Sequence, residues 1–425
     1  MKLEHFYSSK KHFFLLSLFL ISLFFFSYID IQNYSIHIIF LLIVTFFSLL
    51  NYQKILKIEK IYIIFFILLF LLNFKNILLN EDFYLFTKNF SKYFLSPLFI
   101  FISIYSYIHN KKSLIFFIRL LIFLNIFNII FIFLQFFSFD FAWELRDKIG
   151  IIEESSVYLN RPLIPGLAFS SLTCSYQIII LFSISLALFL TELKKRYLLI
   201  VFISCLSLII VNSRSSLIVP VCILLYWILL KFKDYLLKIY INPKLLKKFN
   251  NLLIILIVIT SLFLIADSII DKTLRSPLST IGLRVNLWLT GLYALIDSYG
   301  LGIQFKFDYQ SLYIFLTNNL LFSSPTWLND LLFKNNLSVH NSVILGLLKD
   351  GLFLLVHYAI IYFIIIKNII YYKNTNKFYY YLFFIFFLTH FIHSFFHNSG
   401  IFTNDLFFWV VFSLLASARN LINEN

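Results

Sequence analysis

Charged residues are scarce in this sequence. Asp, Glu, Lys and Arg together make up 13% of its 425 residues, and only 20 residues are acidic. Soluble globular domains carry roughly twice that charged fraction, about 25%. The composition therefore excludes an ordinary soluble globule.

Cysteine is scarce as well. Cys174, Cys205 and Cys222 all lie within or beside apolar runs. This setting favours small buried hydrophobic side chains over a disulfide or a thiol nucleophile.

Apolar residues are abundant instead, at 61% of the chain, with 20% aromatic. Runs of about 15 to 25 such residues recur, and a run of this length can cross a bilayer as a helix. We therefore expect an all-α, polytopic integral membrane protein of about twelve transmembrane helices, with residues 1–425 forming a single membrane domain. The runs are approximately 13–29, 36–50, 61–72, 94–108, 114–137, 167–191, 197–211, 216–230, 251–266, 342–366, 378–396 and 401–418.

The net charge of +15 would suggest nucleic acid as a partner for a soluble chain. Here most Lys and Arg residues fall on one side if the chain changes side at every apolar run. Short cytoplasmic connections of membrane proteins show this enrichment. The distribution predicts cytoplasmic termini and membrane lipids as partners, with no nucleic acid.

The longest connection on the opposite, periplasmic side is residues 267–341, between the ninth and tenth runs. Residues 284–299 within this loop have the spacing of an amphipathic helix. Gly300 and Gly302 are expected to end that helix, because glycine readily adopts the left-handed conformation. Trp288 lies on its apolar stripe and favours packing against the membrane.

Arg214 lies in a short periplasmic turn, flanked by Ser213 and Ser215. A turn this close to hydrocarbon normally avoids a fixed charge. Arg214 is either a snorkelling side chain or a forked donor for phosphate oxygens, with the hydroxyls completing the site. Arg284 is likewise an ordinary loop residue or a cation at the rim of the helix bundle.

His340 and Asn341 precede the tenth run. They are either a polar helix end or a site where the imidazole abstracts a proton from a sugar hydroxyl. Lys349 and Asp350 lie further into the same run, and we expect them to pair with each other or with a neighbour.

His390, His393 and His397 have the spacing of one helix face in the eleventh run. They form either a polar interior stripe or part of the cavity that contains His340. A metal site has weak support because no carboxylate lies nearby in the sequence. Arg161 and Arg146 are further periplasmic cations that could contact an anionic ligand.

Together these features resemble the O-antigen ligase and O-antigen polymerase superfamily of membrane glycosyltransferases. The resemblance covers about residues 210–355 through the Asn212–Ser216 turn, Arg284 with Trp288, the Gly300 and Gly302 turn, and His340–Asn341 with Gly351. Leu354 and Trp288 depart from the ligase pattern, which has Thr, Tyr or Val at the first position and Leu at the second.

The resemblance implies an enzyme of the bacterial inner membrane that uses a glycan on undecaprenyl diphosphate, without metal or cofactor. A ligase transfers the glycan to lipid A–core, and a polymerase transfers it to another lipid-linked glycan. It further implies that His340, Arg284 and Arg214 are catalytic. The substrate-binding residues would be Asn341, Ser213, Ser215, Arg161, Trp288, His393 and His397.

A transporter or flippase is the alternative from another class. Transporters usually show paired halves with matching polar interruptions, and this sequence shows neither.

Overall fold

In the residues that it describes, the computed structural model of this protein is helical apart from two short antiparallel strands, β1 (Asp30–Ile31) and β2 (Tyr34–Ser35). The chain divides into two compact units. The first unit is Met1–Leu217 with Phe353–Ser394 and Ser399–Asn425, and the second is Ile218–Leu352 with Phe395–Asn398. The structure describes residues 2–26, 30–31, 34–50, 55–78, 87, 90–148, 164–211, 215–218, 220–223, 288, 291–292, 295–296, 298–302, 341–403 and 405–423.

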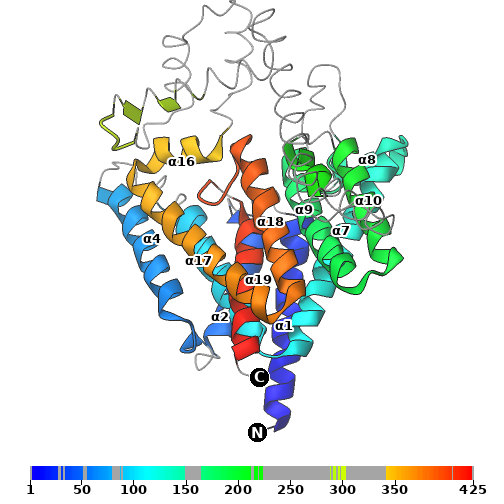
Figure 1. The fold of residues 1–425 in the computed structure, drawn as a ribbon, viewed down its shortest axis with the longest axis horizontal. Helices are drawn as coiled ribbons and strands as arrows, with labels where there is room; N and C mark the ends of the chain where they lie inside the picture. Colours follow the sequence, from blue (N-terminus) through cyan, green and yellow to red (C-terminus); the bar gives the residue numbers. More distant parts are fainter. Residues whose placement is uncertain are drawn as a thin grey trace, which may run out of the picture. The chain divides into compact units, whose positions relative to one another are not determined.

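The helices of the first unit pack mostly side by side (Figure 1). The closest pairs are α9 with α10, α1 with α2, and α6 with α19. Phe395, the last residue of α18, belongs to the second unit. The helices are α1 (Lys2–Phe25), α2 (Ile36–Leu49), α4 (Lys60–Leu78), the π-helix η1 (Ser91–Leu95), α6 (Ser96–Tyr107), α7 (Lys111–Phe136), α8 (Asp140–Lys148), α9 (Ser171–Glu192), α10 (Lys195–Ile210), α17 (Phe353–Thr375), α18 (Lys377–Phe395) and α19 (Leu406–Asn423).

Four of the described helices are long and apolar enough to cross a membrane: α7, α9, α17 and α18. Shorter apolar helical stretches are His12–Phe25, Ile36–Leu49, Lys60–Phe74 and Leu406–Ile422. The all-helical class and the presence of candidate spans therefore agree with the sequence. The number of about twelve spans stays a prediction, since the ninth run and much of the eighth lie outside the described residues.

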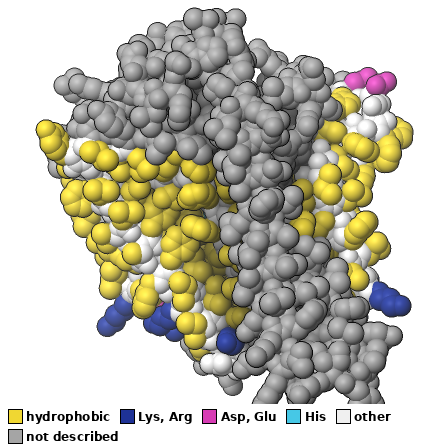
Figure 2. Space-filling view, turned by 45° about the horizontal axis from the view of Figure 1, so that its top comes forward, with side chains coloured by type: hydrophobic (Ala, Val, Ile, Leu, Met, Phe, Trp, Pro, Cys, Tyr) yellow, Lys and Arg dark blue, Asp and Glu magenta, His cyan; other side chains and the backbone are white. Residues whose placement is uncertain are grey.

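The exposed surface of these helices is itself apolar. Ile63, Ile67 and Leu71 of α4 and Phe123 and Ile130 of α7 are all more than a third exposed. Figure 2 shows apolar side chains forming a band, with Lys and Arg side chains gathered along one edge. Such a band suits lipid better than water.

One end of the first unit collects its cations. Lys60 begins α4, Lys111 begins α7, Lys195 begins α10 and Lys377 begins α18. The start of α1 and the end of α19 lie at this same end (Figure 1). The cytoplasmic location of the two termini stays a prediction.

The tenth apolar run is not one helix, and the prediction of a single span over 342–366 is wrong. The run forms α16 (Ser342–Asp350), breaks at Gly351, and resumes as α17 at Phe353. Gly351 has φ +77° and ψ −176°, a conformation that is essentially restricted to glycine. Lys349 and Asp350 pair at 3.7 Å, as predicted.

Candidate functional site

The predicted site residues divide into those that the structure describes and those that it does not. Ser215 and His393 lie in the first unit, and Asn341, Trp288 and His397 lie in the second. The remaining predicted residues lie outside the described residues: Arg214, Ser213, Arg284, His340 and Arg161.

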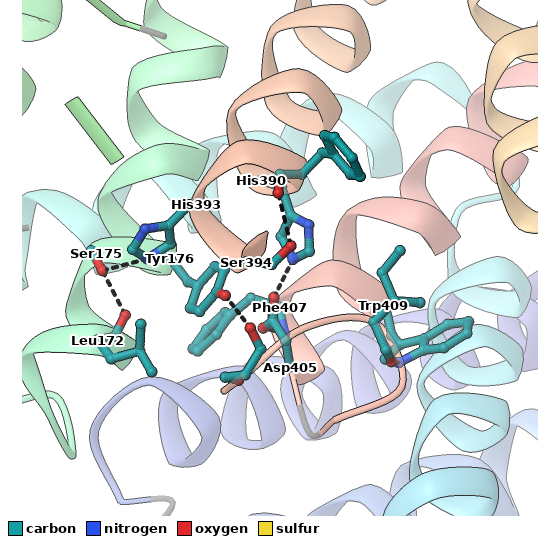
Figure 3. A network of polar contacts seen from close by, with 12 residues as sticks. Leu172, Ser175, Tyr176, His390, His393, Ser394, Asp405, Phe407 and Trp409 are labelled. Atoms are coloured by element: carbon teal, nitrogen blue, oxygen red, sulfur yellow. Dashed lines mark hydrogen bonds and ion pairs between the residues drawn. The ribbon is translucent and has the colours of Figure 1, made fainter. Parts of the chain in front are cut away.

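Two of the predicted residues are in direct contact. The Nδ1 atom of His393 lies 2.9 Å from Ser215 Oγ, although the two residues are 178 positions apart in the chain. The other ring nitrogen, Nε2, lies 2.9 Å from the hydroxyl oxygen of Ser175 on α9 (Figure 3). His393 is fully buried, so its imidazole joins two segments of the first unit.

His390, one turn earlier on α18, has a different partner. Its Nε2 atom lies 2.5 Å from Asp405 Oδ2, and both side chains are buried (Figure 3). The other carboxylate oxygen of Asp405 accepts a hydrogen bond of 3.0 Å from the backbone N–H of Phe407, in the first turn of α19. This is the usual role of an aspartate at a helix start.

The expectation that no carboxylate lies near these histidines is therefore wrong. Asp405 is 15 residues after His390 in the sequence, but α18 and α19 are consecutive helices with a short connection. The end of one helix thus lies near the start of the next. An aspartate inside the last apolar run was the signal for this contact in the sequence.

Tyr176 lies between the two imidazoles. Its ring centroid is 5.2 Å from that of His390 and 4.6 Å from that of His393. The phenol donates a short hydrogen bond to the carbonyl of Ser399. The cluster made by Ser175, Tyr176, His390, His393, Ser215 and Asp405 is hereafter the histidine cluster.

His397 lies beyond the end of α18. Helix α18 ends at Phe395, so the predicted face of three histidines is wrong at its third member. Among the described residues, no group of three His, Cys, Asp or Glu side chains is placed to hold a metal ion.

A buried amide network fixes the start of α9, which carries Ser175 and Tyr176. Asn128 of α7 donates to Gln177 Oε1 at 2.8 Å and accepts from the backbone N–H of Leu167 at 2.8 Å. Gln135 of α7 exchanges two hydrogen bonds of 2.9 Å with the backbone of Gly166. Gly166 has φ +62°, and a Cβ atom there would lie 2.4 Å from Asn128 Oδ1. The segment leading into α9 is therefore held firmly against α7.

The histidine cluster lies at the end of its helices opposite to the cations. Tyr176 is near the start of α9, His393 is in the last turn of α18, and Asp405 immediately precedes α19. The cations at the other ends of these three helices are Lys194, Lys377 and Arg419. If the cations mark the cytoplasmic side, the cluster is in the periplasmic half of the unit.

In the second unit, the two glycine elements of the sequence pattern meet. The backbone N–H of Leu352 donates to the carbonyl of Gly300 at 2.8 Å. A Cβ atom on Gly302 would lie 2.7 Å from the nitrogen of Gly351, and one on Gly351 would lie 2.6 Å from the oxygen of Leu301. Among the described residues, the helix before Gly300 ends at Ile296. Tyr299 already has a left-handed φ of +54°, so the helix stops before it reaches the glycines.

The other described residues of this unit have clear local roles. The Asn341 Oδ1 atom accepts from the backbone N–H groups of Val343 and Ile344, both at 3.0 Å, and so caps α16. Its Nδ2 atom is buried and has no hydrogen-bond partner among the residues that the structure describes. The ring of Trp288 packs against Phe395 and Phe396, with centroids 5.3 and 5.9 Å away.

Neither a family model nor a curated protein nor a solved structure matches this chain. Function is therefore inferred from the residues and their geometry.

Proposed function

We propose that this protein is an O-antigen ligase-like glycosyltransferase of the bacterial inner membrane. It moves a glycan from undecaprenyl diphosphate to lipid A–core on the periplasmic face, without a metal and with inversion of the anomeric carbon. The new bond joins the acceptor oxygen to the anomeric carbon, while the bond from that carbon to the diphosphate oxygen breaks.

The roles follow from the chemistry of this step. Arg214 and Arg284 bind the departing lipid diphosphate, because guanidinium groups offer forked donors to phosphate oxygens. They neutralise charge as it develops in the transition state. His340 takes the proton of the acceptor hydroxyl.

The observation that carries this proposal is the contact between the Gly300–Gly302 turn and Gly351. These glycines are elements of the sequence pattern that resembles the family, and their backbones approach too closely for any side chain. The contact joins the segment that follows Arg284 to the helix that follows His340. The buried amide of Asn341 gives further support, because Asn341 is a predicted substrate-binding residue.

The test is glycan transfer by purified, reconstituted protein, supplied with undecaprenyl-diphosphate glycan and lipid A–core. Loss of one charged donor to the transition state costs about 100-fold in kcat, so we expect a loss of that order for Arg284→Ala. Arg284→Lys keeps the charge but loses the fork, and should recover only part of the rate. Arg196→Ala, at an exposed cation in the first turn of α10, is the matched control and should transfer normally. Undiminished transfer by Arg284→Ala would contradict the diphosphate role.

A polymerase is the second candidate, favoured by the two departures from the ligase pattern at Leu354 and Trp288. The same reconstituted protein should then elongate a lipid-linked glycan and leave lipid A–core unmodified. Supplying both acceptors together decides between the two functions by the mass of the product.

A further inference from the structure

We propose that His393 is a positioning residue, whose imidazole ties Ser215, the residue that follows Arg214 in the sequence, to α9. The inference rests on the proposed function in one respect, which is that Arg214 contacts the lipid diphosphate. His393 itself would not touch the substrate, because both of its ring nitrogens are occupied by serine hydroxyls and the side chain is fully buried.

The number of hydrogens on each group determines which atom donates in each of these hydrogen bonds. The Ser175 hydroxyl donates its hydrogen to the carbonyl of Leu172 at 2.7 Å. The Ser175 oxygen must therefore accept from His393, and Nε2 must carry a hydrogen. In the neutral ring, Nδ1 is then the acceptor and the Ser215 hydroxyl is the donor.

Both sides of this tether are buried. Ser215 is 8% exposed, and the adjacent Ser216 is fully buried. On the other side, Ser175 lies on the stretch of α9 that Asn128 and Gln177 fix to α7. The tether therefore connects Ser215 to a rigid part of the first unit.

Restraint at Ser215 passes directly to Arg214. Consecutive Cα atoms are fixed at about 3.8 Å, so a hydrogen bond that holds Ser215 limits the positions available to the preceding residue. Catalytic groups need this precision, because a misplacement of about 1 Å can lower the rate about 100-fold.

Two substitutions of His393 separate its two contacts. The Asn side chain can place its carbonyl oxygen near the Nδ1 position, and so accept from Ser215. The Gln side chain can place its amide nitrogen near the Nε2 position, and so donate to Ser175. Because the tether needs both contacts, we expect His393→Asn and His393→Gln each to lose about 10- to 100-fold in kcat at unchanged KM for the acceptor.

Ser215→Ala should reproduce the loss seen with His393→Gln, because it removes the same hydrogen bond. The matched control is Ser394→Ala. Its buried hydroxyl donates to the carbonyl of Phe391 at 3.0 Å, within its own helix, so transfer should be unchanged. Normal transfer by folded His393→Asn and His393→Gln protein, or by folded Ser215→Ala protein, would overturn the inference.

A spectroscopic measurement tests the tether without any transfer assay. The measurement is ¹⁵N NMR of protein in liposomes with labelled histidine. The signals that are absent from the spectrum of the His393→Asn variant are those of His393. We expect a hydrogen on Nε2 and a hydrogen-bonded, unprotonated Nδ1. A hydrogen on Nδ1 alone would refute the tether while leaving the proposed function intact. Conversely, wild-type protein with the expected tautomer and no transfer to either acceptor would refute the proposed function and, with it, the purpose assigned to His393.

Discussion

In the first unit, helix ends are joined through buried side chains: His390 binds Asp405, and His393 binds Ser175 and Ser215. In the second unit, the turns at Gly302 and Gly351 meet through bare backbone, with no room for a Cβ atom. The first arrangement depends on which polar groups are present, and the second on side chains being absent. The two regions should therefore respond to opposite kinds of substitution.

The largest effect is expected from His390→Leu. Removing one partner of a buried pair leaves the other buried and uncompensated, which costs about 3–5 kcal/mol. The free energy of unfolding in detergent should fall by this order. His357→Leu is the matched control: this buried histidine bonds to the carbonyl of Phe353 in its own helix, so a much smaller loss is expected.

The double variant His390→Leu/Asp405→Asn sharpens this result. The amide removes the carboxylate charge and keeps an oxygen that can accept from the N–H of Phe407. The double variant should be more stable than His390→Leu alone. Equal or lower stability would show that the pair is not what holds these helix ends together.

A smaller but clear effect is expected from Gly351→Ala. Backbone strain at a position restricted to glycine costs about 1–3 kcal/mol, and the added methyl group also meets the oxygen of Leu301. The variant should unfold at a lower temperature in detergent. Gly346→Ala makes the same chemical change inside α16, where φ is not positive. If the two variants were equally stable, the close backbone contact would not contribute to the stability of the folded protein.

The smallest effect is expected from Asn128→Leu. This change leaves the backbone N–H of Leu167 without its side-chain acceptor, and an unsatisfied buried donor costs about 1–3 kcal/mol. Asn125→Leu, on the same helix, is the control, because the Asn125 amide donates only to Leu121 of its own helix among the described residues. Chemical unfolding of both variants checks the difference, and equal stability would contradict a structural role for the Asn128 network.

Several features of this fold could be predicted from the sequence. The helical class follows from the long apolar runs, and the Lys349–Asp350 pair follows from the cost of burying single charges. Each of these depends on residues close together in the chain.

The features that could not be predicted depend on contacts between distant segments. The break at Gly351 is hidden because Leu347, Leu348, Leu352 and Phe353 keep the run apolar on both sides. The role of Ser175 and Tyr176 depends on α9 packing beside α18, which no local pattern reveals.

The His390–Asp405 pair has a consequence for the joint between the last two helices. It fastens α19 to α18 independently of the peptide links that connect them. A chain cut after Asn398, or expressed as two fragments divided there, should then keep its last helix in place through this pair and the packing of α19 on α6. Loss of either side chain should weaken the binding of the shorter fragment.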